Sequence, residues 1–342
     1  MNILPLICIA GALLSAEPAA NPQPPLVTES QKHMGTEFTI QLHAPEGTDA
    51  KAALQAAFAK IAALDRTMTD YDPDSELSRL GATSPHAAPV PVSEDLGKAL
   101  QAAIEISKAT DGAFDVTIGP LTRLWRQARR QKKIPDKDKL QAALAAVGYQ
   151  HLRVEQAKDG QWTAQLLKPH MRLDLGGIGQ GYAADVALNI LRERGFSMAL
   201  VNASGDIAVG DAPPGTTGWK IGLTALVPGQ APPQFVRLKN AAISTSGDAF
   251  QFVEVEGQRY SHIVDPKTGL GLTTPMAVTV IATNCTRADA YASALCVLGA
   301  ERAKEDRFHR EARLSALLIM KTPAGVQTTE LSNFNRYLDV QK

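Results

Sequence analysis

A glycine-rich segment between Asp174 and Gly181 carries the clearest chemical signal in this sequence, where it reads DLGGIGQG. Glycine has no Cβ, so main-chain groups at such a segment can approach a ligand closely. Apolar residues follow at helical spacing and Gly195 stands where a helix would end, which places the glycines at a helix N-terminus that favours anions. The segment predicts a phosphate or metal site, and a purely structural strand-to-helix turn is the alternative.

Several familiar nucleotide and hydrolase motifs do not fit the sequence. Tyr182 stands where the third glycine of the dinucleotide fingerprint would be, so a Rossmann domain is only the second choice. No Walker lysine follows the glycines, and no Gly-x-Ser-x-Gly elbow occurs. The remaining motifs must therefore decide the function.

Composition restricts the class of protein further. The chain has 342 residues, 44% of them hydrophobic, and 35 basic residues balance 35 acidic ones, so no global charge recruits nucleic acid. The charged stretch from Arg123 to Lys139 has little aromatic interleaving and is interpreted as a solvated excursion. Cys285 and Cys296 have no zinc spacing and are expected to be buried packing residues.

The N-terminus resembles an export signal followed by a proline-rich linker. An apolar run from Ile3 to Leu14 is too short to span a bilayer, and the linker extends to Pro25. We expect residues 1–25 to be signal and linker, and residues 26–342 to form one domain of a soluble, exported, periplasmic protein. A lipoprotein anchor at Cys8 is the less favoured alternative, because the bulky Ile7 precedes it.

Hydrophobic periodicity predicts a mixed α+β domain that is α-rich to about residue 170 and β-rich afterwards. Besides the helix after the glycines, it predicts helices over 49–65, from Ser93 to Gly112, before Gly148, around 288–298 and over 301–309. Strands are expected at 34–42, 219–223, 235–238, 250–255, 259–264, 278–282 and 314–320. Glu256-Gly257 is expected to turn a hairpin.

Further motifs accompany the glycine segment in a fixed order. They read VNASGD, STSGD, SHIVDPKTG and RADAYASA in the second half, with Met-Gly-Thr, Tyr-Asp-Pro, SELSRL and GAFD in the first half. In this order and spacing the chain closely resembles the ApbE family over about residues 34–320. The resemblance implies a T-fold-related architecture of mixed β-sheets with flanking helices, in two interlocked subdomains.

The resemblance also implies an FAD:protein FMN transferase that depends on Mg²⁺. Such an enzyme splits the FAD pyrophosphate, joins FMN through a phosphoester to a Thr or Ser of an acceptor flavoprotein domain, and releases AMP. That acceptor could bring the protein near a membrane. An Mg²⁺-dependent FAD pyrophosphatase and a non-catalytic FAD-binding protein are the alternatives, kept open because Ala292 replaces a carboxylate of some relatives.

Particular residues can be assigned to this chemistry. Cleavage of a pyrophosphate needs a hard cation, which takes oxygen ligands. Asp289 and Ser293 are four residues apart on an expected helix, so their side-chain oxygens lie on one helix face. By resemblance the metal ligands are Gly177, Asp289, Ala292 and Ser293, the first and third through main-chain oxygens. By the same resemblance the FAD site is lined by Met34, Ala113, Phe114, Asp115, Asp174 and Gln180, with Tyr71 and His262 beside them. Thr245 and Ser246 are further expected flavin or phosphate contacts, and turn chemistry of the STSGD motif is the alternative for both.

His262 and Asp289 are the expected catalytic residues. A histidine whose pKa lies near neutrality can take the proton of an attacking hydroxyl, and phosphate contact is the other role open to His262. Asp265 either orients His262 or caps the Pro-Lys-Thr-Gly turn. Tyr71 is the expected stacking platform for the isoalloxazine, whereas Met34 and Phe114 could equally be core residues.

Overall fold

The computed structural model describes residues 23–223, 234–248, 251–310 and 312–339. The expected signal segment and Cys8 lie outside the described residues. Within those residues, no helix has the length and apolar character to cross a membrane.

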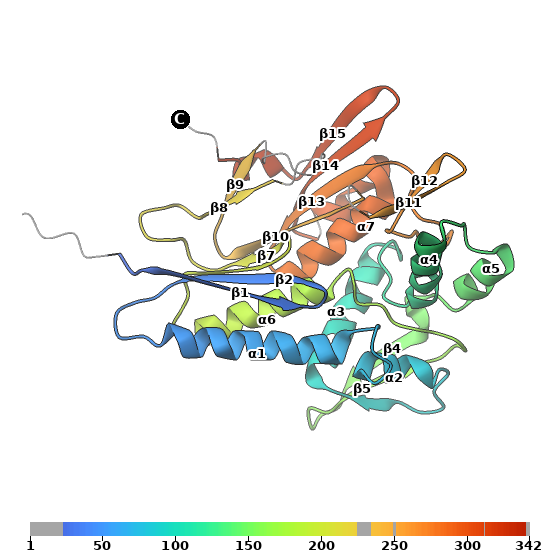
Figure 1. The fold of residues 1–342 in the computed structure, drawn as a ribbon, viewed down its shortest axis with the longest axis horizontal. Coiled ribbons are helices and arrows are strands. Elements are labelled where there is room, and N and C mark those ends of the chain that lie inside the picture. The colour runs from blue at the N-terminus through green and yellow to red at the C-terminus, as the bar shows by residue number, and fades with distance from the viewer. Residues whose placement is uncertain (1–22, 224–233, 249–250, 311, 340–342) are drawn as a thin grey trace, which may run out of the picture.

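A sheet of eight antiparallel strands forms the centre of the molecule, in the order β1-β2-β6-β7-β10-β13-β14-β15 (Figure 1). Its strands are β1 Leu26–His33, β2 Thr36–His43, β6 Ala199–Ala203, β7 Asp206–Val209, β10 Ala241–Gly247, β13 Met276–Ala282, β14 Ser315–Thr322 and β15 Gly325–Leu331. Residues in β13 are buried along its whole length, because both faces of the sheet are covered there.

Two helices, α6 Gly179–Glu193 and α7 Cys285–Ala303, pack on one face of this sheet, and α1 Ala50–Met68 and α3 Glu94–Ala109 lie outside them (Figure 1). The N-caps follow the sequence signals, since Asp49 and Ser93 accept main-chain N–H bonds at the starts of α1 and α3. Alternate positions of β2 and the inner faces of the helices form the main core. Cys285 and Cys296 are buried in it, as expected.

A second, smaller core lies on the opposite face of the sheet. The hairpin β8 Trp219–Gly222 and β9 Phe235–Leu238 packs there with the short 3-10 helix η2 Phe334–Tyr337. Ile243 of β10 points into this core. Neighbouring residues of β10 therefore face two different environments.

The first half of the chain also contains a three-stranded sheet in the order β3-β5-β4. Its strands are β3 Val90–Val92, β5 Trp162–Leu166 and β4 Leu152–Gln156, with η1 Tyr149–His151 leading into β4. Trp162 lies so close to α3 that a Cβ at Gly97 would be 2.5 Å from its ring. The close contact explains the glycine in the interior of that helix.

The remaining elements lie to one side of the helical layer. They are α2 Glu76–Ala82, α4 Gly119–Gln131, α5 Lys137–Ala145, α8 Asp306–His309 and the hairpin β11 Phe252–Val255 with β12 Gln258–Ser261. Glu256 and Gly257 turn this hairpin, as predicted, and both have positive φ. Trp125 of α4 and Tyr260 of β12 stack with ring centroids 5.3 Å apart, which joins the helix to the hairpin.

The predicted α+β class is confirmed, but several expectations need correction. Strand β1 was not expected, although it pairs with β2 along its whole length. Much of the charged stretch from Arg123 is not a solvated excursion, because it belongs to α4, whose Trp125 is buried. The helix expected over 301–309 is divided between the end of α7, which kinks at Gly299, and α8.

Candidate functional site

The glycine turn leads into the N-terminus of α6, as the sequence predicts. Ile178 precedes the helix and provides no side-chain cap. Instead, the main-chain N–H of Gly181 donates to Oδ2 of Asp289, 3.2 Å away on α7. A carboxylate from a neighbouring helix therefore satisfies one of the N–H groups that a helix start leaves free.

Close packing explains two glycines of this turn. A Cβ at Gly181 would lie 2.4 Å from the carbonyl oxygen of Cys285, so α6 and α7 can cross here only without a side chain. A Cβ at Gly177 would lie 3.2 Å from Oγ of Ser293 and 3.3 Å from the ring of Phe114. The turn thus brings Gly177 against Ser293 and Gly181 against Asp289.

Oxygen atoms gather around this junction. The hydroxyls of Ser293 on α7 and Ser246 on β10 are 3.1 Å apart, and Ser244 donates to Asp206 at 2.5 Å. Asp289 is only 5% exposed, and its burial, together with the nearby carboxylate of Asp206, raises its pKa well above the usual value. Burial likewise raises the pKa of Asp206. Two carboxyl groups that resist ionisation therefore share one region.

This region fits a hard divalent cation such as Mg²⁺. Its donors are carboxylate, hydroxyl and main-chain oxygens, which are the ligands Mg²⁺ prefers. Asp206 and Asp185 repel the charged form of Asp289 and help to raise its pKa, and a bound cation would offset this repulsion. Ala292 is fully buried between Asp289 and Ser293 on α7 and could contribute only its main-chain oxygen.

An arginine joins the glycine turn to the end of α1. Arg126 of α4 forms ion pairs with both Asp70 and Asp174, the latter at 2.8 Å. Its guanidinium also lies 4.4 Å from the ring centroid of Tyr71, whose side chain is 77% exposed. The expected surface position of Tyr71 is confirmed, and one face of its ring is covered by a cation.

Met34 and Gln180 lie close together beside this network. The side-chain amide of Gln180 donates to the carbonyl of Met34 at 3.4 Å, while the N–H of Met34 donates to Asp65 at 2.8 Å. Met34 has a φ of 49°, which a non-glycine residue rarely adopts. The turn between β1 and β2 is therefore held against the start of α6.

Ala113, Phe114 and Asp115 occupy a buried loop after α3. The carboxylate of Asp115 accepts bonds from the N–H and hydroxyl of Thr117 and from the N–H of Tyr149. Burial nevertheless raises its pKa. These bonds fix the loop, and the loop presents the ring of Phe114 to Gly177.

His262 directly follows β12 rather than lying within a strand that extends to residue 264. Its Nδ1 lies 3.0 Å from the carbonyl oxygen of Gln251, which can only accept, so Nδ1 carries the proton and Nε2 has a free lone pair. Burial lowers the pKa of His262 below its ordinary value. The lowered pKa favours the neutral form of the imidazole. The guanidinium of Arg129 on α4 donates to the side-chain oxygen of the same Gln251 at 3.1 Å.

The structure decides the two roles considered for Asp265. Its carboxylate accepts bonds from the N–H of Lys267 at 2.8 Å and the hydroxyl of Thr268 at 3.2 Å. Asp265 thus caps the turn. The carbonyl of Gly269 in the same turn accepts from the indole of Trp125 at 2.8 Å, which fastens the turn to α4.

Thr245 is separated from the other predicted site residues. Side chains alternate along β10, so Ser244 and Ser246 face the helices while Thr245 faces the other side. Its hydroxyl lies 2.9 Å from that of Thr279 on β13.

Sequence reasoning did not assign Asp206, Arg126 or Asp70 to the site. The signal for Asp206 was present, because it ends the VNASGD motif. Arg126 and Asp70 lie 56 residues apart, and nothing local in the sequence indicates that they meet.

Together these features define an α+β protein with an oxygen-rich centre between a glycine turn, a helix and the central sheet. The chain belongs to the ApbE family, whose family model matches residues 34–318. It is similar to the FAD:protein FMN transferase of Salmonella typhimurium, with 31% identity over 99% of this chain and 98% of that protein. The Escherichia coli K12 protein of the same name is 31% identical over 91% of this chain and 89% of its own length.

Solved structures agree with this assignment. The flavin transferase ApbE from Vibrio cholerae superposes with a TM-score of 0.82 and 30% identity, covering 92% of this chain and 99% of that one. The apo flavinyl transferase ApbE from Pseudomonas stutzeri has a TM-score of 0.80 and 27% identity, covering 94% and 99% of the two chains.

Proposed function

We propose that this chain is an FAD:protein FMN transferase, which moves the FMN moiety of FAD to a Thr or Ser hydroxyl of an acceptor flavoprotein and releases AMP. One observation carries the proposal in this chain: Asp289 and Ser293 meet Gly177 and Gly181 of the glycine turn. The names of the relatives support the reaction, and the oxygen-rich junction supports a phosphate-transfer site.

In this proposal Asp289, Ser293 and the main-chain oxygens of Gly177 and Ala292 hold Mg²⁺. When bound, the cation would neutralise the pyrophosphate oxygens and the charge that develops on the leaving AMP. Asp289 stays in position through its bond with the N–H of Gly181. Ser246 supports Ser293 from the sheet.

His262 is proposed to activate the acceptor. Its unprotonated Nε2 would take the proton of the Thr or Ser hydroxyl while that oxygen attacks the FMN-side phosphorus. A phosphoester bond then forms as the bond between this phosphorus and the bridging oxygen breaks, and AMP leaves with the bridging oxygen. The bond from Nδ1 to the carbonyl of Gln251 keeps the imidazole in the required tautomer.

Flavin binding is proposed to use the surface around the arginine network. Tyr71 offers an exposed ring, and Arg126 and Asp174 hold each other beside it. Gln180 at the start of α6 and Met34 in the turn between β1 and β2 would line the same region. Ala113, Phe114 and Asp115 would line it from the loop after α3, where Phe114 reaches Gly177.

The test is a covalent labelling assay. The purified chain is incubated with FAD, Mg²⁺ and an acceptor domain, and flavin fluorescence on a denaturing gel is measured together with AMP. We expect labelled acceptor and AMP in equal amounts. FMN and AMP without labelling would instead indicate a pyrophosphatase, and bound but intact FAD beside an acceptor known to be competent would indicate a binding protein.

Two pairs of variants assign the residues. His262→Gln should lose most labelling, whereas His43→Gln on β2 should not, although His43 makes a similar Nδ1 contact with the carbonyl of Pro24. Asp289→Asn should abolish stabilisation of the protein by Mg²⁺ in a melting assay. Asp136→Ala, which removes the N-cap of α5, should lower the melting temperature but keep the response to Mg²⁺.

We also propose that the protein is exported and acts as a soluble periplasmic enzyme, which could approach a membrane through its acceptor. The apolar segment from Ile3 to Leu14 supports this proposal. Mass determination of the secreted N-terminus tests it. Cleavage near Ala16 is the expected result, and a lipid attached to Cys8 would contradict it.

A further inference from the structure

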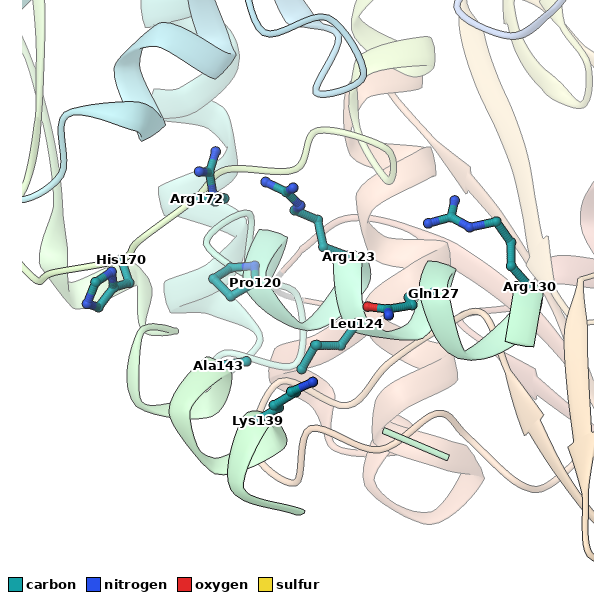
Figure 2. Close-up of a pocket in the computed structure, with 9 residues that line it drawn as sticks. All are labelled: Pro120, Arg123, Leu124, Gln127, Arg130, Lys139, Ala143, His170 and Arg172. Carbon is teal, nitrogen blue, oxygen red and sulfur yellow. The ribbon is translucent and has the colours of Figure 1, made fainter. Parts of the chain in front are cut away.

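A cavity of about 380 Å³ lies between α4, α5 and the segment before the glycine turn (Figure 2). Arg123 and Arg130 of α4, Lys139 of α5, and His170 with Arg172 line it, and the described lining contains no Asp or Glu. Figure 2 shows the guanidinium groups of Arg123 and Arg172 close to one another. Burial lowers the pKa of Arg172, and the positive charge of Arg123 lowers it further.

The concentration of positive charge is local. The whole chain has a formal net charge of zero, so the patch does not result from an overall excess of basic residues. Four permanently charged side chains share one hollow without a carboxylate among its lining residues. Their mutual repulsion costs free energy that an anionic partner would offset.

The patch lies beside the candidate site on the same helix, because Arg123 and Arg130 are each about one turn of α4 away from Arg126. Arg126 and Arg129 of α4 point to Asp174 and to Gln251 next to His262, whereas Arg123 and Arg130 line the cavity. One helical turn, about 5 Å along α4, therefore separates these side chains from Arg126. A short extended segment would span that distance.

The form of the cavity fits a protein surface better than a small molecule. Sites for small ligands are mostly apolar and bury most of the ligand. Here Arg123, Arg130, Lys139 and His170 are all exposed, and only Pro120, Leu124 and Ala143 are apolar. Exposed cations at the rim of a contact mainly accelerate association and select a partner by charge.

We propose that this cationic hollow docks an acidic segment of the acceptor protein whose hydroxyl receives FMN. This inference rests on the proposed function. Residues near the modified Thr or Ser would cross α4, and their carboxylates would pair with Arg123, Arg130 and Lys139. The hollow would thereby steer the acceptor toward His262 without touching FAD.

The test uses the full-length mature protein with the triple variant Arg123→Gln/Arg130→Gln/Lys139→Gln. At low salt, kcat/KM for the acceptor should fall about tenfold through KM, while kcat and KM for FAD stay unchanged. The salt dependence of kcat/KM should become weaker. A matched control, Lys51→Gln/Arg153→Gln/Lys321→Gln, removes three exposed cations on α1, β4 and β14 and should leave every constant unchanged.

A second measurement separates this inference from the proposed reaction. Binding of an acceptor whose modified residue is replaced by Ala is measured by calorimetry, and the cavity variant should bind more weakly than the control. Equal KM values in the two triple variants, with active labelling, would overturn the docking inference alone. No labelling by the wild-type chain would instead overturn the function. Loss of binding to anionic vesicles, with acceptor KM unchanged, would assign the hollow to a membrane and refute the proposal.

Discussion

Substitution of Gly181 by Ala is the sharpest test of the packing between α6 and α7. The added Cβ would lie 2.4 Å from the carbonyl oxygen of Cys285, 2.8 Å from its carbon and 2.9 Å from Cβ of Asp289. Main-chain atoms of a buried helix cannot move aside as a flexible side chain can. Overpacking of this kind costs about 1–3 kcal/mol.

Gly179 provides a matched control on the same turn of α6. A Cβ there meets nothing nearer than Cβ of Leu175 at 3.7 Å, an ordinary contact. Because Ala restricts the unfolded chain more than Gly does, Gly179→Ala should stabilise the protein by up to about 1 kcal/mol. The same gain applies to Gly181→Ala, so the two variants should differ by the overpacking cost of about 1–3 kcal/mol although they make the same chemical change two residues apart.

Urea unfolding followed by tryptophan fluorescence measures this difference, with unchanged m values as the sign that the unfolded states are comparable. The Gly181→Ala protein should also respond less to Mg²⁺, since the displaced helix moves Asp289. Equal free energies of unfolding for the two variants would refute the reasoning, because the close helix crossing would then not constrain residue 181.

Three further predictions follow from individual contacts. If neutral His262 is the base, kcat/KM should be flat near pH 7 and should fall only below pH ~6.5, because burial lowers the pKa of this residue. The His262→Gln variant should not show this fall at acid pH. A fall centred above pH 7, or one kept by the variant, would exclude this role. Arg126→Met leaves Asp70 and Asp174 facing each other and should lower the free energy of unfolding by about 2–4 kcal/mol at pH 7. Burial raises the pKa of Asp70, so the loss should be smaller in acid, where this carboxyl becomes protonated. A denaturation series from pH 4 to 8 measures the loss, and a loss independent of pH would contradict the prediction. Thr245→Val should change KM for FAD by no more than about twofold, since the side chain faces away from α7. A tenfold rise in this KM would instead show that Thr245 contacts FAD.

The parts of the fold that the sequence predicts are those with a strong local signal. The helix that follows the glycine turn is found because apolar spacing, Gly195 and the preceding glycines agree, and α1 and α3 begin at Asp49 and Ser93 as capping residues indicate. Strand β1 has little such signal. Its burial pattern alternates only between exposed and half-buried, because it lies at the edge of the sheet.

The site is predicted where motifs contain its residues and missed where contacts are made only by folding. Asp289 and Ser293 could be placed on one helix face from their spacing alone. Asp206 and Arg126 acquire their roles from Asp289 and Asp174, which lie far away in the sequence. The charges of α4 also concealed its periodicity, because Trp125 is surrounded by arginine and glutamine.

Because its residues come from segments as distant as Met34 and Ser293, the candidate site cannot form before α7 has been synthesised. During synthesis, α7 leaves the ribosome after β1, β2 and α6 have already emerged. The contact between Gly181 and Asp289 can form only after α7 has emerged, and contacts between residues distant in the sequence form slowly. Occupancy by FAD or a metal would therefore mark a molecule in which α7 has packed against α6.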